Sequence, residues 1–446
     1  MRHFLLLPLL FAAPLLSAAD NKRPNLLIIL TDDHGYGDVS AYQKSDVRTP
    51  HIDRIGSEGM LFTDMRANCT VCSPSRAAIL TGRHADRVGV PGVIRLNPND
   101  SWGHLDPGVP TLADELKRAG YHTSLIGKWH LGFGSPNLPN ERGFDFFHGF
   151  LAGMMDDYYK HRRHGIDCMR KNTEVIEAEG HATEVFTNWA IDHFSERKDA
   201  GPFFMYLAYN APHYPIQPPK EWFEKIKQRH PDMNPARARN VAFVEHLDHH
   251  IGRVLAALDE TGLAENTVVV FAADNGGSHP HAQNNDPWRG GKQDHYDGGL
   301  RVPFMVRWPG KIQPGSRSDY AGLLFDIFPT FLELAEAKPS PGLDAVSLAP
   351  IFRGEPLETP ERELYFVRRE GNPKYLGKAY HALIRGDWKI LQNHPFQPFE
   401  LYNLKDDPRE QNDLVKAKPD VFADLAKALS LHIQRGGATP WQAPEK

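Results

Sequence analysis

A cysteine at the start of a predicted helix is the most chemically distinctive feature of this sequence. Cys72 is followed by Pro74 and Arg76 within the segment 68–83, and proline is favoured in a helix's first turn because its missing N–H would be unpaired there anyway. Gly82 is suited to end the helix. Because backbone N–H groups and the helix dipole favour negative charge at this end, we expect the Cys72 thiol to be acidic and reactive. Arg76, one turn later, would direct its donors to the same place.

Cys69 and Cys72 form a C-x-x-C pair, for which other roles are possible. A redox pair is disfavoured, because no short thioredoxin-like βαβ pattern surrounds it. A zinc site needs a second pair of ligands, and the sequence has no second C-x-x-C. A buried structural cysteine would leave the neighbouring Pro74 and Arg76 without an explanation.

Two acidic pairs follow two apolar runs. The runs 25–31 and 267–273 are continuous, as is typical of strands buried on both faces of a parallel sheet. The pairs are Asp32 with Asp33, and Asp274 with Asn275. One such pair alone is typical of a solvated turn. Two pairs, each directly after a buried strand, indicate a site of hard oxygen ligands that suits calcium or magnesium.

Lysine and histidine side chains also follow predicted strands or lie in a glycine-rich segment. The predicted strands 121–126 and 203–209 run into polar segments, and a further glycine-rich segment precedes residue 300. The side chains in question are Lys128, His130, His213 and Lys292. Taken singly, each is typical of a surface lysine or a satisfied histidine. Because ligands bind outside the carboxyl ends of parallel strands, together they predict a cationic pocket capable of acid/base chemistry.

Helices alternate with these strands, which predicts an α/β fold with a mostly parallel central sheet. The predicted helices span 49–59, 111–119, 182–197 and 238–261. Proline-rich sequence at 338–342 and 354–360 marks a change. Strand-like pieces at 363–367, 381–385 and 388–391 and a helix over 419–435 then predict a smaller α+β domain with an antiparallel sheet. We expect a catalytic domain over 20–355 and a C-terminal α+β subdomain over 356–446.

Composition limits the class of protein. The chain has 446 residues, 41% hydrophobic and 24% charged, as in ordinary globular proteins, and a formal charge of −5 argues against a nucleic-acid partner. Residues 1–19 combine a basic start, an apolar run and small residues, which predicts a signal peptide cleaved near Ala19. No other stretch is long and apolar enough to span a membrane. We therefore expect an exported protein, either periplasmic, secreted or luminal.

The segment from Cys72 to Arg83, with its Cys-Ser-Pro-Ser-Arg start, resembles the signature of the formylglycine-dependent sulfatases. These form the arylsulfatase-like family of the alkaline phosphatase superfamily. In that family the cysteine of C-x-P-x-R is oxidised by a maturation enzyme to formylglycine (3-oxoalanine). The resemblance runs from Asn25 to about Pro309 and continues in 401–408. It implies an alkaline-phosphatase-like α/β sandwich.

The resemblance also implies one calcium ion and a set of roles. The ligands would be Asp32, Asp33, Asp274, Asn275 and an oxygen of the hydrated formylglycine at Cys72. One hydroxyl of that diol would attack sulfur, with the charge on sulfur's oxygens stabilised by calcium, Arg76, Lys128 and Lys292. His213 would protonate the leaving alcohol, and His130 would deprotonate the second hydroxyl so that sulfate leaves.

Two smaller expectations accompany these roles. Asp297 stands where many relatives have glutamate, and we expect that difference to matter little. If Cys72 is converted to an aldehyde, Cys69 and Cys168 are left as a possible pair, which the sequence does not decide.

Three loops without an assigned role are candidates for substrate contacts. Their candidate residues are Arg95, Trp102, His104, Arg162, Arg163, His281 and Trp288. A tryptophan could stack on a sugar ring. The basic run from Lys160 to His164 could bind a second anionic group or be a solvated loop. We therefore expect a sulfated carbohydrate substrate.

Two alternative functions stay open. Phosphonate monoester and phosphodiester hydrolases of the same superfamily can use the same signature. The other alternative is a non-catalytic protein that binds sulfated glycans through an unmodified Cys72, which the intact set of lysines and histidines argues against.

Overall fold

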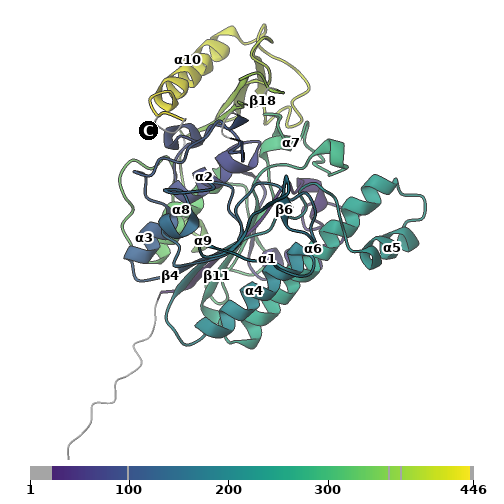
Figure 1. Ribbon diagram of the computed structural model, residues 1–446. Helices are drawn as coiled ribbons and strands as arrows, with labels where there is room; N and C mark the ends of the chain where they lie inside the picture. The colour runs from purple at the N-terminus through teal and green to yellow at the C-terminus, as the bar shows by residue number, and fades with distance from the viewer. Residues whose placement is uncertain (1–22, 98–99, 360–361, 372–373, 442–446) are drawn as a thin grey trace, which may run out of the picture.

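The computed structural model describes residues 23–97, 100–359, 362–371 and 374–441 (Figure 1). The predicted signal peptide over 1–19 and its cleavage near Ala19 lie outside these residues. Among the described helices, none has both the length and the apolar character needed to cross a membrane.

A mixed sheet forms the centre of the described chain. Its strands, in spatial order, are β13 (Ser316–Ser318), β2 (Met60–Phe62), β12 (Phe304–Arg307), β11 (Thr267–Ala273), β1 (Asn25–Thr31), β10 (Phe203–Ala208), β4 (His122–Lys128), β5 (Phe146–Phe150), β8 (Met169–Lys171) and β9 (Glu174–Val175). The pairs from β11 through β1, β10 and β4 to β5 are parallel. Antiparallel pairs flank them on both sides. The predicted mostly parallel central sheet is therefore confirmed.

Alternate residues of β1 build two separate cores. Leu26, Ile28 and Leu30 lie in one apolar cluster, and Leu27 and Ile29 lie in another. Successive side chains of a strand point to opposite faces, so each cluster fills one face of the sheet. A fully buried Leu or Ile contributes about 1.5–3 kcal/mol. The continuous apolar run in β1 thus stabilises a three-layer sandwich.

Helices cover both faces of the sheet (Figure 1). The helices α2 (Cys72–Thr81), α3 (Leu112–Arg118), α8 (Ile327–Leu334) and α9 (Ala349–Phe352) contribute to the first core. The helices α1 (Pro50–Ser57), α4 (Ala182–Arg197) and α6 (Pro235–Glu260) contribute to the second, and α5 (Lys220–Arg229) packs on α6. Short elements complete this part of the chain: β3 (Met65–Arg66), β6 (Arg162–Arg163), β7 (Ile166–Asp167), β14 (Gly322–Leu323) and α7 (Asp297–Leu300).

Helix ends follow local sequence signals. Thr111 and Asp114 form a reciprocal capping box at the start of α3, as their spacing predicts. Helix α6 begins three residues earlier than the predicted 238, because the Asn234 side chain accepts hydrogen bonds from the N–H groups of Ala236 and Arg237. Thr49 stands at the N-cap of α1, but its hydroxyl makes no capping bond to the helix backbone. It donates instead to the Asp53 carboxylate at 2.9 Å.

A four-stranded antiparallel sheet forms the C-terminal part, as predicted. Its strands are β15 (Glu363–Arg369), β16 (Ala379–Arg385), β17 (Trp388–Gln392) and β18 (Glu400–Asn403). One face packs against residues of α2 and 300–325, and the other packs under α10 (Pro419–Gly436). The division between residues 355 and 356 stays a prediction.

Buried ion pairs around Asp297 join the C-terminal sheet to the larger part of the chain. The Asp297 carboxylate accepts from Arg66 at 2.8 Å, from Arg301 at 3.0 Å and from Lys389 of β17 at 2.9 Å. Lys389 also pairs with Glu410 at 2.7 Å. Burial opposes the charge on Asp297, but these cations hold its pKa well below the usual value. The carboxylate of Asp297 is therefore the centre of a buried charge network, and the expectation that aspartate in place of glutamate matters little stays a prediction.

Candidate active site

The parallel register brings the carboxyl ends of four strands together. Strand β1 lies between β10 and β11, and β4 lies beside β10. Thr31, the last residue of β1, is level with Ala273 of β11, and its neighbour Leu30 is level with Ala208 of β10. The residues that follow these strands therefore emerge at one edge of the sheet.

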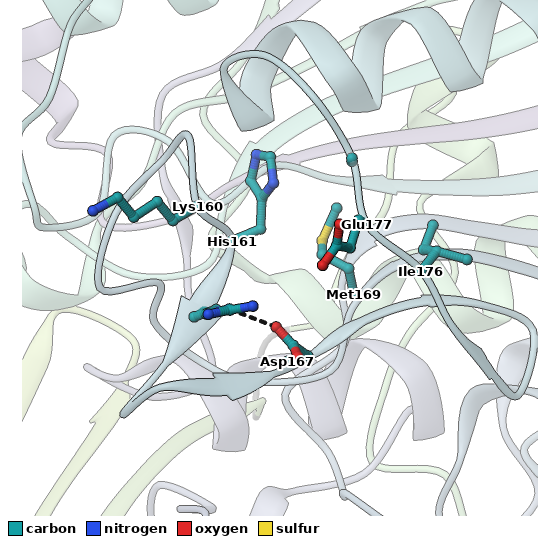
Figure 2. Close-up of a pocket in the computed structure, with 8 residues that line it drawn as sticks. Lys160, His161, Asp167, Met169, Ile176 and Glu177 are labelled. Carbon is teal, nitrogen blue, oxygen red and sulfur yellow. Dashed lines mark hydrogen bonds and ion pairs between the residues drawn. The ribbon is translucent and has the colours of Figure 1, made fainter.

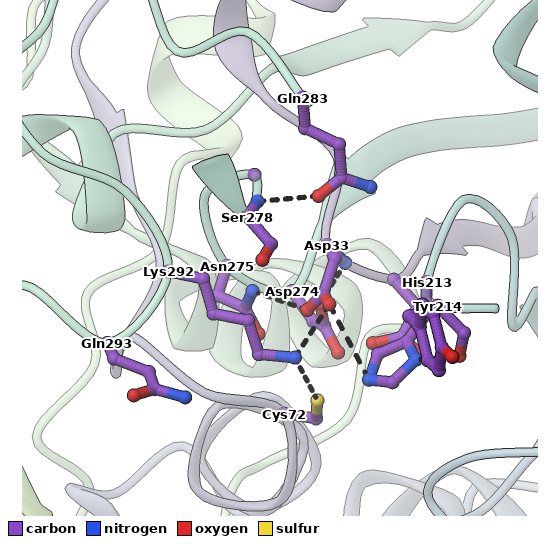
Figure 3. Close-up of polar contacts among 12 residues, drawn as sticks. Asp33, Cys72, His213, Tyr214, Asp274, Asn275, Ser278, Gln283, Lys292 and Gln293 are labelled. Atoms are coloured by element: carbon purple, nitrogen blue, oxygen red, sulfur yellow. Dashed lines mark hydrogen bonds and ion pairs between the residues drawn. The ribbon is translucent and has the colours of Figure 1, made fainter. Parts of the chain in front are cut away.

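Asp33 lies at the centre of the polar side chains at this edge (Figure 3). Its carboxylate accepts from Asn275 Nδ2 at 2.8 Å and from Lys292 Nζ at 2.6 Å. His213 Nε2 lies 3.5 Å from Asp33 Oδ2, and the Asp33 N–H donates to Asp274 Oδ1 at 3.2 Å. Burial opposes the charge on Asp33, but the adjacent His213 and Lys292 lower its pKa. An ionised carboxylate therefore connects three predicted site residues.

A second group of ion pairs connects Asp32 and Asp274 to two cations. Arg76 Nε donates to Asp274 Oδ2 at 2.9 Å, and Arg76 Nη2 lies 3.7 Å from Asp32 Oδ1. Lys128 Nζ donates to Asp32 Oδ2. All four side chains are fully buried. Burial, followed by the nearby Asp32, raises the pKa of Asp274 to about 6, which reflects the crowding of three carboxylates in one place.

Cys72 begins helix α2, as its sequence context predicts. Val71 is extended before it, and Gly82 ends the helix with a φ of 64°, in the left-handed region that glycine tolerates. Cys72 Sγ lies 3.9 Å from Lys292 Nζ and is 3% exposed. Burial, followed by the charge of Asp32, raises the pKa of the Cys72 thiol. The expected acidic thiol is therefore wrong, since desolvation outweighs the helix N-terminus.

The two predicted catalytic histidines are each held by a backbone carbonyl. His130 Nε2–H donates to Ile94 O at 3.0 Å, while its Nδ1 is buried without a hydrogen-bond partner. His213 Nδ1–H donates to Tyr214 O at 2.6 Å, which leaves Nε2 toward Asp33. A carbonyl oxygen only accepts, so these bonds place the proton on each ring. Burial lowers the pKa of His130 far below its usual value and that of His213 to about 3.

These side chains can hold a metal ion. Among the described residues, one group of four offers ligand atoms within 4.8 Å of one another: Asp32, Asp33, Cys72 and His213. Asp32 Oδ1 and Asn275 Oδ1 are buried and accept no hydrogen bond. Unpaired oxygens that are buried so deeply are costly unless something positive meets them. Three of the predicted calcium ligands, Asp32, Asp33 and Cys72, are in this group. Asp274 pairs with Arg76, as Asp32 does with Lys128 and Asp33 with Lys292, and the full ligand set stays a prediction.

Comparison with known proteins agrees with this geometry. A sulfatase family model matches residues 24–337, which is well over half of the chain. A model for the C-terminal region of N-sulphoglucosamine sulphohydrolase matches residues 291–435.

The chain belongs to the sulfatase family.

It is therefore a sulfuric ester hydrolase of the arylsulfatase-like group in the alkaline phosphatase superfamily, and the predicted family and enzyme class are confirmed. Canine N-acetylgalactosamine-6-sulfatase is 33% identical over 388 residues, covering 81% of this chain and 72% of its own length. N-acetylgalactosamine-6-O-sulfatase of Bacteroides thetaiotaomicron is 28% identical, covering 95% and 98%. The crystal structure of Ps i-CgsB in complex with a neocarrahexaose is 27% identical, with a TM-score of 0.85 over 94% of this chain and 95% of that chain.

Several residues that support this sulfatase site had no signal in the sequence. The Tyr158 hydroxyl donates to Asn210 O at 2.8 Å and to His213 O at 3.0 Å, which anchors the loop that carries His213. Gln283 Nε2 donates to Pro212 O at 2.9 Å, and its Oε1 accepts from the Ser278 N–H at 2.5 Å. These contacts depend on the path of distant loops, so spacing along the chain cannot predict them.

The candidate substrate residues of the sulfatase lie in different surroundings. Arg162 pairs with Asp167 at 2.6 Å, and Arg163 pairs with Asp156 at 2.8 Å. Figure 2 shows Asp167 directed at its arginine partner, on the rim of a cavity of about 230 Å³. Arg95 pairs with Glu370 at 2.8 Å. Each of these arginines therefore already has a carboxylate partner.

The aromatic candidates also differ. Trp288 has the Arg301 guanidinium 4.1 Å from its ring centroid and meets Tyr36 edge-on. Trp102 stacks on Trp441, and His104 is partly buried. Among these seven candidates, His281 is the one whose pKa responds to Asp33 and Lys292 of the site, after the larger effect of burial.

The three cysteines Cys69, Cys72 and Cys168 are free thiols in the structure.

Proposed function

We propose that this sulfatase hydrolyses the sulfate ester of a sulfated carbohydrate, using a formylglycine made from Cys72 and one bound calcium ion. The observation that carries the proposal is the position of Cys72 at the start of α2, beside Lys292 and below Asp33. The relatives named above include sulfatases of N-acetylgalactosamine 6-sulfate. Their substrates support the carbohydrate class for this chain.

The buried charges match such a reaction. Asp32, Asp33 and Asp274 are balanced by Arg76, Lys128 and Lys292, which pair with them. A divalent cation held by Asp32, Asp33, Asp274, Asn275 and residue 72 would make the centre positive, which attracts a sulfate ester. Calcium would supply a fixed positive charge toward the sulfuryl oxygens. Oxidised to formylglycine, residue 72 would supply a hydrated aldehyde as the nucleophile in place of a thiol.

The chain's own cations would stabilise charge during the reaction. Lys292 Nζ is 3.9 Å from Cys72 Sγ, so it can donate to an oxygen of a sulfuryl group bound at residue 72. Lys128 and Arg76 pair with the neighbouring carboxylates of Asp32 and Asp274. Donors that are already in place where negative charge develops lower the barrier without reorganisation.

The histidines would move protons at defined atoms. A substrate anion favours the charged form of His213, which would keep Nδ1–H on Tyr214 O and present Nε2–H to the leaving alcohol oxygen. His130 keeps its proton on Nε2, bound to Ile94 O, and its Nδ1 lone pair is free to accept a proton. We therefore propose His213 as the acid and His130 as the base.

Two measurements on enzyme made beside a maturation partner test the proposal. The mass of the tryptic peptide 67–76 shows whether the Cys72 sulfur has been exchanged for oxygen. Anion release is then measured from 4-nitrophenyl sulfate, a phosphonate monoester and a panel of galactose, glucosamine and galactosamine sulfates. We expect conversion at residue 72 and fastest release from one sulfated sugar.

Three other outcomes would favour a different function or exclude the mechanism. Faster cleavage of the phosphonate than of every sulfate would favour a phosphorus-ester hydrolase. An unmodified Cys72 with binding but no turnover would favour a glycan-binding protein. Full turnover by a Cys72→Ala variant would exclude the mechanism.

A further inference from the structure

An exposed aromatic pair lies next to the proposed acid. Tyr214 follows His213 in the chain and is 46% exposed. Its ring stacks on His281, with centroids 4.7 Å apart and planes 21° from parallel. A single exposed tyrosine is ordinary on a protein surface. Tyr214 differs from such a residue in two ways. Its ring stacks on a second ring, and it is adjacent in the chain to the proposed acid.

Two loops fix this pair in place. Gln283 follows two residues after His281, and its side chain donates to Pro212 O, one residue before His213. Figure 3 shows Gln283, His213 and Tyr214 around the same site. The loop of His281 is therefore fastened to the loop of Tyr214 by a buried hydrogen bond.

The orientation of Tyr214 is coupled to that of His213. The Tyr214 carbonyl accepts from His213 Nδ1 at 2.6 Å, so the backbone that positions the phenol ring also sets the direction of the imidazole. The phenol ring is therefore carried by the residue that follows the proposed acid in the chain and holds its Nδ1. His281 lies close enough to Asp33 and Lys292 for both charges to act on its pKa, after the larger effect of burial.

We propose that the Tyr214–His281 stack is the platform on which the sulfated sugar ring lies during hydrolysis. This rests on the proposed carbohydrate function and names the surface that would bind its substrate. A pyranose has an apolar C–H face that can lie on an aromatic ring, and sites for such ligands combine flat apolar walls with a few polar groups. The ring that carries the ester fits best, because its oxygen must reach His213.

The two tryptophans considered from the sequence are less suited. Trp288 carries an arginine over its ring, and Trp102 stacks on another tryptophan. Tyr214 has one side supported by His281 and still leaves nearly half of its surface exposed. The platform therefore combines a residue that the sequence suggested, His281, with one that it did not.

Steady-state kinetics of three variants test the platform. Tyr214→Leu keeps apolar volume but removes the flat ring, Tyr214→Phe keeps the ring, and Tyr159→Leu is a matched control at a tyrosine that is 45% exposed elsewhere. KM and kcat are measured with the best sulfated monosaccharide of the panel. The inhibition constant of inorganic sulfate reports on the sulfate-binding centre alone.

We expect Tyr214→Leu to raise KM for the sugar by about five- to ten-fold, the order of one aromatic contact. Tyr214→Phe and Tyr159→Leu should behave as wild type, and sulfate inhibition should be unchanged in all three. Unchanged sugar kinetics in Tyr214→Leu would overturn the platform while leaving the substrate class intact. A parallel change in sulfate inhibition would also overturn it, as a disturbance of the centre. If wild type hydrolyses no sulfated sugar, the proposed function fails and the platform with it.

Discussion

His130 and His213 each have one ring nitrogen bound to a backbone carbonyl, and the two rings therefore leave different nitrogens free. In His130 the carbonyl holds Nε2–H and leaves Nδ1 as a free acceptor. In His213 it holds Nδ1–H and leaves Nε2 toward the site. His130 also has a φ of 61°, and a Cβ on Gly153 would meet its ring at 2.1 Å. The imidazole is therefore fitted closely against a backbone that has no room for a side chain.

If His213 is the acid, its loss should depend on the leaving group. A sugar alcohol needs a proton as it departs, whereas nitrophenolate leaves readily without one. We expect His213→Ala to lower kcat for a sulfated sugar by about 10²–10⁴-fold and to affect 4-nitrophenyl sulfate much less. Steady-state rates with both substrates measure the difference. His161→Ala, at a buried histidine of another loop, is the control. Equal losses on both substrates would contradict the assignment.

Chelation should affect both stability and rate if Asp32 and its neighbours hold calcium. A ligand that binds only the folded state at 100 times its Kd adds about 2.7 kcal/mol. We therefore expect a chelator to lower both Tm and activity, and added Ca²⁺ to restore them. Asp32→Asn should lose this response, while Asp156→Asn, at an exposed ion pair, should keep it. A chelated enzyme that calcium does not restore would refute the metal assignment.

At the scale of elements, the central strands were predictable and the outer ones were not. The runs that became β1 and β11 were predicted to the residue, because burial on both faces leaves an uninterrupted apolar stretch. Strands β2 and β13 have three residues each, too few to show a period.

The same contrast holds for the site. The predicted edge of the sheet collected Asp32, Asp33, Lys128 and Asp274 because strand register alone decides where strand ends meet. Arg301 is four residues from Asp297, but the other partners of Asp297 and the partner of His281 come from segments far away in the sequence, and no local pattern encodes them. Sequence therefore predicted the chemistry of the centre better than the surface that would bind the sugar.

Asp297 should be among the costliest residues to change. Its carboxylate meets three buried cations from different elements, and removing one member of a buried charge network leaves the others unpaired. We expect Asp297→Ala to lower the free energy of unfolding by about 3–5 kcal/mol, as measured by urea unfolding. Asp156→Ala, which breaks an exposed pair with Arg163, should cost under about 1 kcal/mol. Similar losses for both variants would show that the network is not a major source of stability.

At the scale of the whole molecule, the C-terminal sheet joins the larger unit on two sides. One of its faces packs on residues of α2 and the segment before α8. Helix α10 covers the other face and reaches back to Asp86, where a Cβ on Gly436 would meet the carboxylate at 1.7 Å. Helix α2, which begins with Cys72, therefore contacts the C-terminal sheet through its later residue Ala78.

Asp86 makes this contact sensitive to pH. The residue is fully buried, and its Oδ2 accepts from the Tyr365 hydroxyl of β15 at 3.0 Å. Its Oδ1 has no hydrogen-bond partner. Burial raises the pKa of Asp86 to about 6 from an ordinary value of 3.8. The folded protein therefore keeps a proton that the unfolded chain loses between those two values.

The sign of the effect follows from this difference. Below the pKa of the unfolded chain, Asp86 is protonated in both states and does not change the free energy of unfolding. As pH rises through about 4 to 6, the folded state loses stability relative to the unfolded chain. The loss reaches up to about 3 kcal/mol for two pKa units. Asp86→Asn cannot ionise, and its carbonyl oxygen can still accept from Tyr365. The stability of the variant minus that of wild type should therefore rise between pH 4 and pH 6 and then level off. Urea unfolding at a series of pH values measures this difference, and taking the difference cancels the titration of His84 and Glu363 nearby. A difference that stays flat across this range would show that Asp86 is ionised in the folded protein at acidic pH, and that the junction with α10 is held by a charge rather than by a neutral carboxyl.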